Sequence, residues 1–223
     1  MSSTSSEPIQ AAISPEEIVA ELNAVDWSHL RGNFDSVAAI LARVGQADCL
    51  DDLTGRLENG SHLLRCCEFF DWRAQARGRF WLLVLAMDPE TRVRLRMHVY
   101  EDHRNLPHNH RYDFGVSVLT GTYEHILYDE NLKPALIARF RAGDYYMFGC
   151  GGVHSIECEG LCVTLMARGP VVRDTAVNFS EGGIKIHYGV RSPCARNNSY
   201  QSVPIRREDV MILRSRFRDA GLI

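Results

Sequence analysis

The sequence PHNHRYDF, residues 107–114, contains two histidines one residue apart in a segment with the features of a β-strand. On a β-strand, residues two apart project to the same face, so His108 and His110 would point together while Asn109 points away. Their Cα atoms would lie about 6–7 Å apart, and both imidazoles could therefore reach one metal ion. Pro107 suits a strand entrance, because proline lacks the N–H that the interior of a ladder needs. A third ligand must come from another strand, and His154 supplies it.

The spacing of glycines and histidines around this stretch resembles the two motifs of the cupin superfamily. The matching residues are His108, His110 and Gly121 in the first motif and Gly143, Gly151 and His154 in the second. Gly149 stands where the second motif has proline, and Cys158 stands where it has asparagine. The resemblance covers residues 92–170. It implies a mainly β fold, the cupin jelly-roll barrel or double-stranded β-helix.

The first motif departs from the family at Phe114, where cupins usually carry a glutamate ligand. An unbroken strand from 108 to 118 would point Phe114 into the barrel and leave a site of three histidines without a carboxylate. Such a site resembles that of cysteine dioxygenase and related thiol dioxygenases. The cysteine that those enzymes cross-link to tyrosine would fall at or beside Phe114, so no such cross-link is expected. A bulge in the strand would instead turn Asp113 inward as a ligand or as a partner of a ligand.

The ligand set restricts the metal only to a first-row divalent ion. Imidazole suits iron, nickel, copper and zinc, and affinity alone does not favour iron. The resemblance implies Fe(II), with Ni, Mn or Zn as other occupants. A face of three nitrogen ligands leaves positions for both a substrate and O₂, so oxygen activation is the expected chemistry. Zn(II) or Mn(II) would instead act as a Lewis acid.

Residues near the motif could anchor a substrate. In thiol dioxygenases an arginine on a preceding strand holds the substrate carboxylate, and Arg94 and Arg96 are placed to do this if their face lines the barrel. The alternative is a solvated strand face. Tyr112 would face inward beside His110 and could donate a hydrogen bond to a bound ligand. Other histidines could approach the site, although each alone is more often structural: His98, His103, His125 and His187.

The amino-acid composition limits the classes of protein to which this chain could belong. The chain of 223 residues contains 45% hydrophobic and 24% charged residues and has a formal net charge of −3, values that are typical of a soluble globular protein. We therefore expect neither a nucleic-acid nor a membrane partner. The N-terminus lacks the features of a signal peptide. Seven cysteines, an odd number, indicate reduced thiols in the cytoplasm. A homodimer is compatible with the sequence.

Hydrophobic periodicity predicts the domain organisation. Residues 1–13 are expected to be a disordered tail, and residues 14–223 a single cupin domain. Within that domain, helical spacing predicts a helical layer over 14–70, which begins at a capping box formed by Ser14 and Glu17. Short alternating segments predict the barrel over 80–190, and a basic amphipathic pattern predicts a final helix over 205–220.

We therefore expect a mononuclear non-haem Fe(II) cupin oxygenase, of the dioxygenase type, that acts with O₂ on a small polar metabolite. An amino acid, a thiol or a related acid would be its substrate. A non-oxidative metal-dependent cupin isomerase or lyase is one alternative, and dependence of turnover on O₂ and Fe(II) would separate the two. A non-catalytic ligand-binding cupin is another, and it would bind its ligand without turnover.

Overall fold

The structure is a computed structural model that describes residues 13–72, 77–179, 185–189 and 202–223. The predicted disordered tail lies outside these residues except for Ile13, which packs against the hydrophobic core. Among the described residues, no helix is both long enough and apolar enough to cross a membrane.

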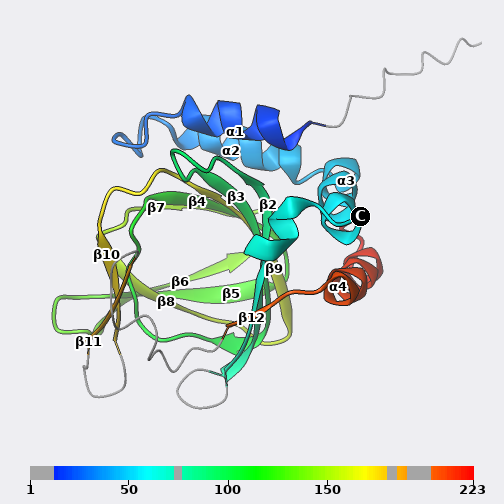
Figure 1. Cartoon of the computed structure of the whole chain (residues 1–223). Helices are drawn as coiled ribbons and strands as arrows, with labels where there is room; N and C mark the ends of the chain where they lie inside the picture. The colour runs from blue at the N-terminus through cyan, green and yellow to red at the C-terminus, as the bar shows by residue number, and fades with distance from the viewer. Residues whose placement is uncertain (1–12, 73–76, 180–184, 190–201) are drawn as a thin grey trace, which may run out of the picture.

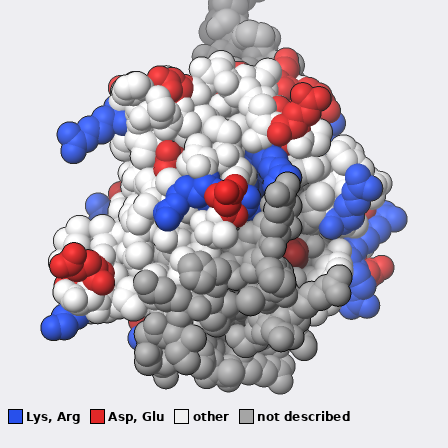
Figure 2. Space-filling model, turned by 60° about the vertical axis from the view of Figure 1, so that its left-hand side comes forward, with Lys and Arg blue, Asp and Glu red and all other residues white. Residues whose placement is uncertain are grey.

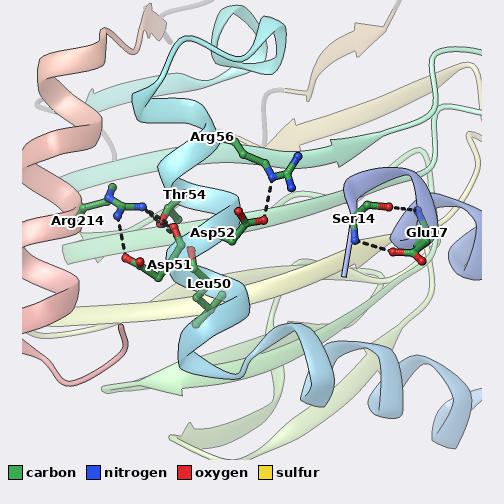
Figure 3. Close-up of polar contacts among 8 residues, drawn as sticks. All are labelled: Ser14, Glu17, Leu50, Asp51, Asp52, Thr54, Arg56 and Arg214. Carbon is green, nitrogen blue, oxygen red and sulfur yellow. Dashed lines mark hydrogen bonds and ion pairs between the residues drawn. The ribbon is translucent and has the colours of Figure 1, made fainter. Parts of the chain in front are cut away.

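The helices begin and end close to the predicted positions. They are α1 (Pro15–Asn23), α2 (Phe34–Val44), α3 (Ala47–Glu58), the 3-10 helix η1 (His62–Cys66) and α4 (Arg207–Asp219). The capping box before α1 is confirmed, because the backbone N of Ser14 donates to Oε2 of Glu17 (2.8 Å) and the N of Glu17 donates to Oγ of Ser14 (3.1 Å; Figure 3). It satisfies two N–H groups at the start of α1.

The remaining elements are strands. They are β1 (Glu68–Trp72), β2 (Arg77–Met87), β3 (Arg94–Arg104), β4 (Phe114–Thr120), β5 (Thr122–Tyr128), β6 (Pro134–Arg141), β7 (Tyr145–Phe148), β8 (Val153–Glu157), β9 (Leu161–Arg168), β10 (Thr175–Phe179), β11 (Lys185–Gly189) and β12 (Ser202–Pro204).

The strands form a nearly closed antiparallel barrel of two facing layers (Figure 1). One layer has the order β12-β1-β2-β3-β9-β4-β7, and the other contains β8-β5-β6. The layers meet where Arg104 of β3 pairs with Glu157 of β8. The mainly β fold with N-terminal and C-terminal helices, predicted from the sequence, is confirmed.

The predicted helical layer (14–70) ends earlier than expected, because its last residues belong to β1. Aromatic side chains explain why this segment pairs with β2. Phe69 stacks on Trp81 with ring centroids 5.0 Å apart, and Phe70 stacks on Phe80 at 5.4 Å. Aromatic pairs across two strands stabilise a sheet, and their alternation places one pair on each face of the sheet.

The two faces of the first layer have opposite character. Leu95, Met97 and Val99 of β3 belong to the main hydrophobic core, together with the buried residues of all four α-helices. Figure 1 shows α1 and α2 above this layer and α3 and α4 beside it. Arg96 and His98 of β3 face the barrel interior and are also buried. The interpretation of this face as a solvated strand surface is therefore wrong.

Charged side chains on the outer surface are mixed in sign. On the face that Figure 2 shows, basic and acidic side chains are interspersed and in places adjacent to one another.

One buried arginine joins the C-terminal helix to the helical layer. Nη1 of Arg214 donates to Oγ1 of Thr54 (2.8 Å) and to the backbone O of Asp51 (2.6 Å), and its Nη2 donates to Oδ1 of Asp51 (2.7 Å; Figure 3). Its Nε also lies 2.7 Å from Oε2 of Glu58. The side chain of Arg214 is only 7% exposed, so these partners stabilise a charge that water cannot reach.

Replacement of this arginine should destabilise the fold. We expect Arg214→Ala to lower the free energy of unfolding by about 2 kcal/mol, because it leaves partly buried acceptors unpaired. Arg218→Ala is the matched control, since Arg218 lies 4.0 Å from the same carboxylate but is 55% exposed. Its effect should stay within about 0.5 kcal/mol. Equal effects of the two substitutions in urea unfolding would contradict this role of Arg214.

Candidate metal centre

The stretch that carries the first two histidines runs between β8 of the second layer and β10, which forms a separate two-stranded sheet with β11. The backbone N of His108 donates to the O of His154 (2.8 Å), and the N of His154 donates to the O of His108 (2.9 Å). On the other side, the N of Asn109 donates to the O of Val177 (3.0 Å). His108 is thereby paired with both β8 and β10, which fixes it beside His154.

The expected unbroken strand from 108 to 118 is wrong in its first half. β4 begins only at Phe114, in the other layer, and the chain crosses between the layers at residues 110–113. Asp113 fixes this corner, because its Oδ1 accepts a hydrogen bond from the N of Cys150 (2.6 Å) and its backbone O accepts one from the N of Gly169 (2.9 Å). The carboxylate of Asp113 is thus engaged at the corner, and it lies outside the histidine cluster.

The three predicted histidines come together inside the barrel. One ligand nitrogen from each of His108, His110 and His154 lies within 4.8 Å of the other two. The Nε2 atoms of His110 and His154 are 2.8 Å apart. Two imidazole nitrogens bound to one ion at about 2.0–2.1 Å in neighbouring octahedral positions would be about 3 Å apart. The cluster could therefore hold a metal ion.

Hydrogen bonds orient two of the rings for this task. Nδ1 of His108 lies 2.9 Å from the O of Leu106. A carbonyl oxygen can only accept, so this Nδ1 carries the proton and Nε2 keeps its lone pair for a ligand. Nδ1 of His154 lies 2.6 Å from Nε2 of His125, which is 3% exposed on β5. If His154 binds a metal through Nε2, its Nδ1–H donates to His125.

The cluster is held in the uncharged form that binds metal ions. Burial lowers the pKa of His108, His110 and His154, and for the last two the neighbouring imidazoles lower it further. Burial also lowers the pKa of His125 to about 4. The four rings are therefore neutral near pH 7, and no proton needs to leave before a metal binds.

Phe114 occupies the side of the cluster where the first cupin motif usually has its carboxylate. It is fully buried, and its ring centroid lies 4.8 Å from that of His110 and 5.9 Å from that of His154. Among the described residues, no carboxylate belongs to the cluster. The arrangement fits the interpretation with three histidines and no acidic ligand.

The cluster lies in the wall of a cavity of about 440 Å³. This volume suits a small molecule. The wall contains both polar and apolar side chains. The residues that line it include Phe80, Leu82, Arg96, His98, Tyr100 and Tyr112, together with the three histidines of the cluster.

Two buried arginines flank Tyr112 beside the histidines. Nη1 of Arg96 donates to the hydroxyl of Tyr112 (3.2 Å), and the guanidinium carbon of Arg168 lies 3.9 Å from the centre of the Tyr112 ring. Burial and the neighbouring charge of Arg96 together lower the pKa of Arg168 to about 9. Burial raises the pKa of Tyr112, but Arg96 and Arg168 outweigh this effect and leave it below the usual value.

Neither Arg96 nor Arg168 forms an ion pair with a carboxylate of the described residues. Arg94 is placed differently from Arg96: it is partly buried opposite Arg168 in the β3–β9 ladder and does not line the cavity. Since buried charges are normally paired, Arg96, the arginine that lines the cavity, makes this end of it suited to an anion.

Sequence reasoning did not assign a site role to His125 or Arg168. The alternation of β5 could have placed His125 inside, two residues after Tyr123, but no local pattern indicates its contact with His154. No local sequence pattern indicates a role for Arg168, because its contact with Tyr112 joins two segments that are far apart in the sequence. His98 and His103, treated as structural, line the cavity. The side chain of His187 lies outside the described residues.

The sequence matches no known protein-family model, and no curated protein matches it. Solved structures do match in fold. An RmlC-like cupin from Shewanella frigidimarina is 14% identical with a TM-score of 0.36, and the match covers 46% of this chain and 83% of that one. A cupin superfamily protein from Desulfitobacterium hafniense is 16% identical with a TM-score of 0.35, covering 41% and 77%.

A ribosomal oxygenase from Escherichia coli is 11% identical with a TM-score of 0.42, and the match covers 54% of this chain and 43% of that one. Likeness at this level concerns the fold alone. The nearly closed antiparallel barrel and its flanking helices fit the cupin fold expected from the sequence.

Proposed function

We propose that this protein is a mononuclear non-haem Fe(II) oxygenase that acts with O₂ on a small organic acid, such as an amino acid or a thiol acid. The proposal rests on the neutral cluster of His108, His110 and His154, which contains no carboxylate among the described residues and opens onto a cavity that Arg96 lines. Bound Fe(II) would supply O₂ activation, since three nitrogen ligands leave positions for substrate and O₂.

The chain's own residues would hold and orient the substrate. Arg96 would bind the substrate carboxylate, because a guanidinium presents two parallel N–H donors to a carboxylate. The hydroxyl of Tyr112 already accepts a hydrogen bond from Arg96. Its own proton can therefore be donated to a ligand at the cluster. Phe114 packs against two of the histidines and keeps water from that side of the cluster.

Oxygen consumption tests the proposed reaction. Protein loaded with Fe(II) under nitrogen should consume O₂ when a member of a panel of amino acids, thiol acids and related carboxylates is added. The product should contain oxygen from ¹⁸O₂. Turnover that is independent of O₂, or that is supported equally by Zn(II), would contradict an oxygenase and favour a lyase or isomerase. Absence of turnover with the whole panel would also contradict the proposal.

Metal content tests the proposed ligands. His154→Ala should lower bound Fe(II) from about one ion per chain to less than about a tenth of that, because a two-histidine face binds weakly. His62→Ala is the control, since His62 is an exposed histidine outside the cluster. Elemental analysis after dialysis measures both. Equal iron content in the two variants would remove His154 from the site.

His125 should position His154 without binding metal itself. His125→Phe removes the acceptor for the Nδ1–H of His154, and we expect Fe(II) affinity to fall by about 10–100-fold. His125→Gln keeps an acceptor on its side-chain amide and should recover most of the loss. A competition titration with a coloured chelator gives both affinities. Equal affinity in the wild type and His125→Phe would contradict this role.

Arg96 should contribute to substrate binding rather than to stability. Arg96→Met is expected to lower kcat/KM for the preferred acid by about 100-fold, because it leaves the carboxylate unpaired in a buried site. The free energy of unfolding should not fall, since the change removes a buried charge that forms no ion pair with a described carboxylate. Arg139→Met, on the exposed surface of β6, is the control. Reduced stability with unchanged kcat/KM would overturn the assignment.

A further inference from the structure

One polar atom in the cavity wall, Nε2 of His98, has no role in the metal centre or in the binding of the substrate carboxylate. His98 of β3 lines the cavity and is only 5% exposed. Its Nδ1 lies 3.0 Å from the hydroxyl of Tyr100. Its Nε2 is buried and has no hydrogen-bond partner within the described part of the chain. Buried polar groups nearly always have a partner, so this nitrogen requires an explanation.

Counting donors and acceptors indicates what the missing partner must be. If the Tyr100 hydroxyl donates to Nδ1, one group is left over, the Nε2–H of His98. If Nδ1–H donates instead, two groups are left over, the tyrosine O–H and the Nε2 lone pair. An unmade buried hydrogen bond costs about 1–3 kcal/mol, so the first arrangement is favoured. His98 then presents a free N–H donor, which needs an oxygen acceptor.

The position of His98 relates this donor to the carboxylate anchor. Arg96 and His98 are two residues apart on β3 and face the same side, so their Cα atoms are about 6–7 Å apart. The Nε of Arg96 is also buried without a partner among the described residues. A single small molecule could satisfy both side chains.

The wall around His98 is apolar. Phe80 meets the edge of the His98 ring with centroids 5.2 Å apart and stacks on Tyr100 at 5.0 Å. Leu82, directly opposite His98 on β2, also lines the cavity. The part of a ligand that joins the two polar anchors therefore contacts hydrocarbon and aromatic surface, which favours an unsubstituted carbon chain there.

We infer that the substrate is a bifunctional acid, whose carboxylate binds Arg96 and whose second oxygen acceptor, across a short apolar chain, binds the Nε2–H of His98. The inference rests on the proposed function for the carboxylate anchor at Arg96. It adds a second subsite that selects oxo acids, hydroxy acids and dicarboxylates over simple fatty acids. His98 is accordingly the residue that determines specificity.

Binding of two matched acids tests the inference without turnover. The probes are hexanoate and 5-oxohexanoate, which differ by one carbonyl oxygen, titrated calorimetrically into metal-loaded protein under nitrogen. Wild type should bind the oxo acid about tenfold more tightly, because the carbonyl accepts from a donor that is otherwise unpaired. His98→Phe should bind both acids equally, with an affinity for hexanoate within about twofold of that of the wild type.

A second variant separates the hydrogen bond from the shape of the side chain. His98→Gln retains a side-chain N–H donor and should keep most of the preference for the oxo acid. Equal binding of the two acids by wild type, a preference that persists in His98→Phe, or no binding of either acid would each overturn the inference. Failure to consume O₂ would contradict the proposed function but would not affect the preference for 5-oxohexanoate over hexanoate. The two proposals can therefore fail independently.

Discussion

Two backbone hydrogen bonds between His108 and His154 are the constraint on which the rest of the site depends. They pair a short segment after Pro107 with β8, and so bring together two ligands that are far apart in the sequence. The chain then turns into the other layer, with Asp113 bound to the N of Cys150. His110 lies on this crossing. The geometry of the cluster is therefore determined by main-chain pairing, which rotation of a single side chain cannot undo.

One face of the barrel wall packs in the hydrophobic core and stabilises the fold, and the other face lines the cavity of the candidate site. Alternate residues of β3 pack against the helices, and the residues between them line the cavity. Arg96 and Arg168 are buried without ion pairs to described carboxylates, and this burial lowers the stability of the fold. The apolar core and the anchored helix α4 offset this cost. Among the described residues, Arg96 forms no ion pair and Nε2 of His98 has no hydrogen-bond partner, so an anionic, oxygen-rich ligand would complete the cavity wall.

The fold and the three histidines could be predicted from the sequence because their signals are patterns of residue type and spacing that can be read along the chain. Glycine and histidine spacing indicated the barrel, alternation placed Arg96 and His98 on one face of β3, and the capping box located the start of α1. The strand predicted through Arg111 and Tyr112 was wrong, because the crossing between layers depends on Asp113 and Cys150, which meet only in the folded chain. The contacts of His125 with His154 and of Arg168 with Tyr112 join different strands, so no local pattern could reveal them.

Anomalous X-ray diffraction at the iron absorption edge, from crystals grown anaerobically with Fe(II), tests the central claim most directly. We expect a single peak within coordination distance of a nitrogen from each of His108, His110 and His154, with Phe114 beside it and no carboxylate bound. A peak at another position, a carboxylate in the coordination shell, or rings turned away from a common point would contradict it.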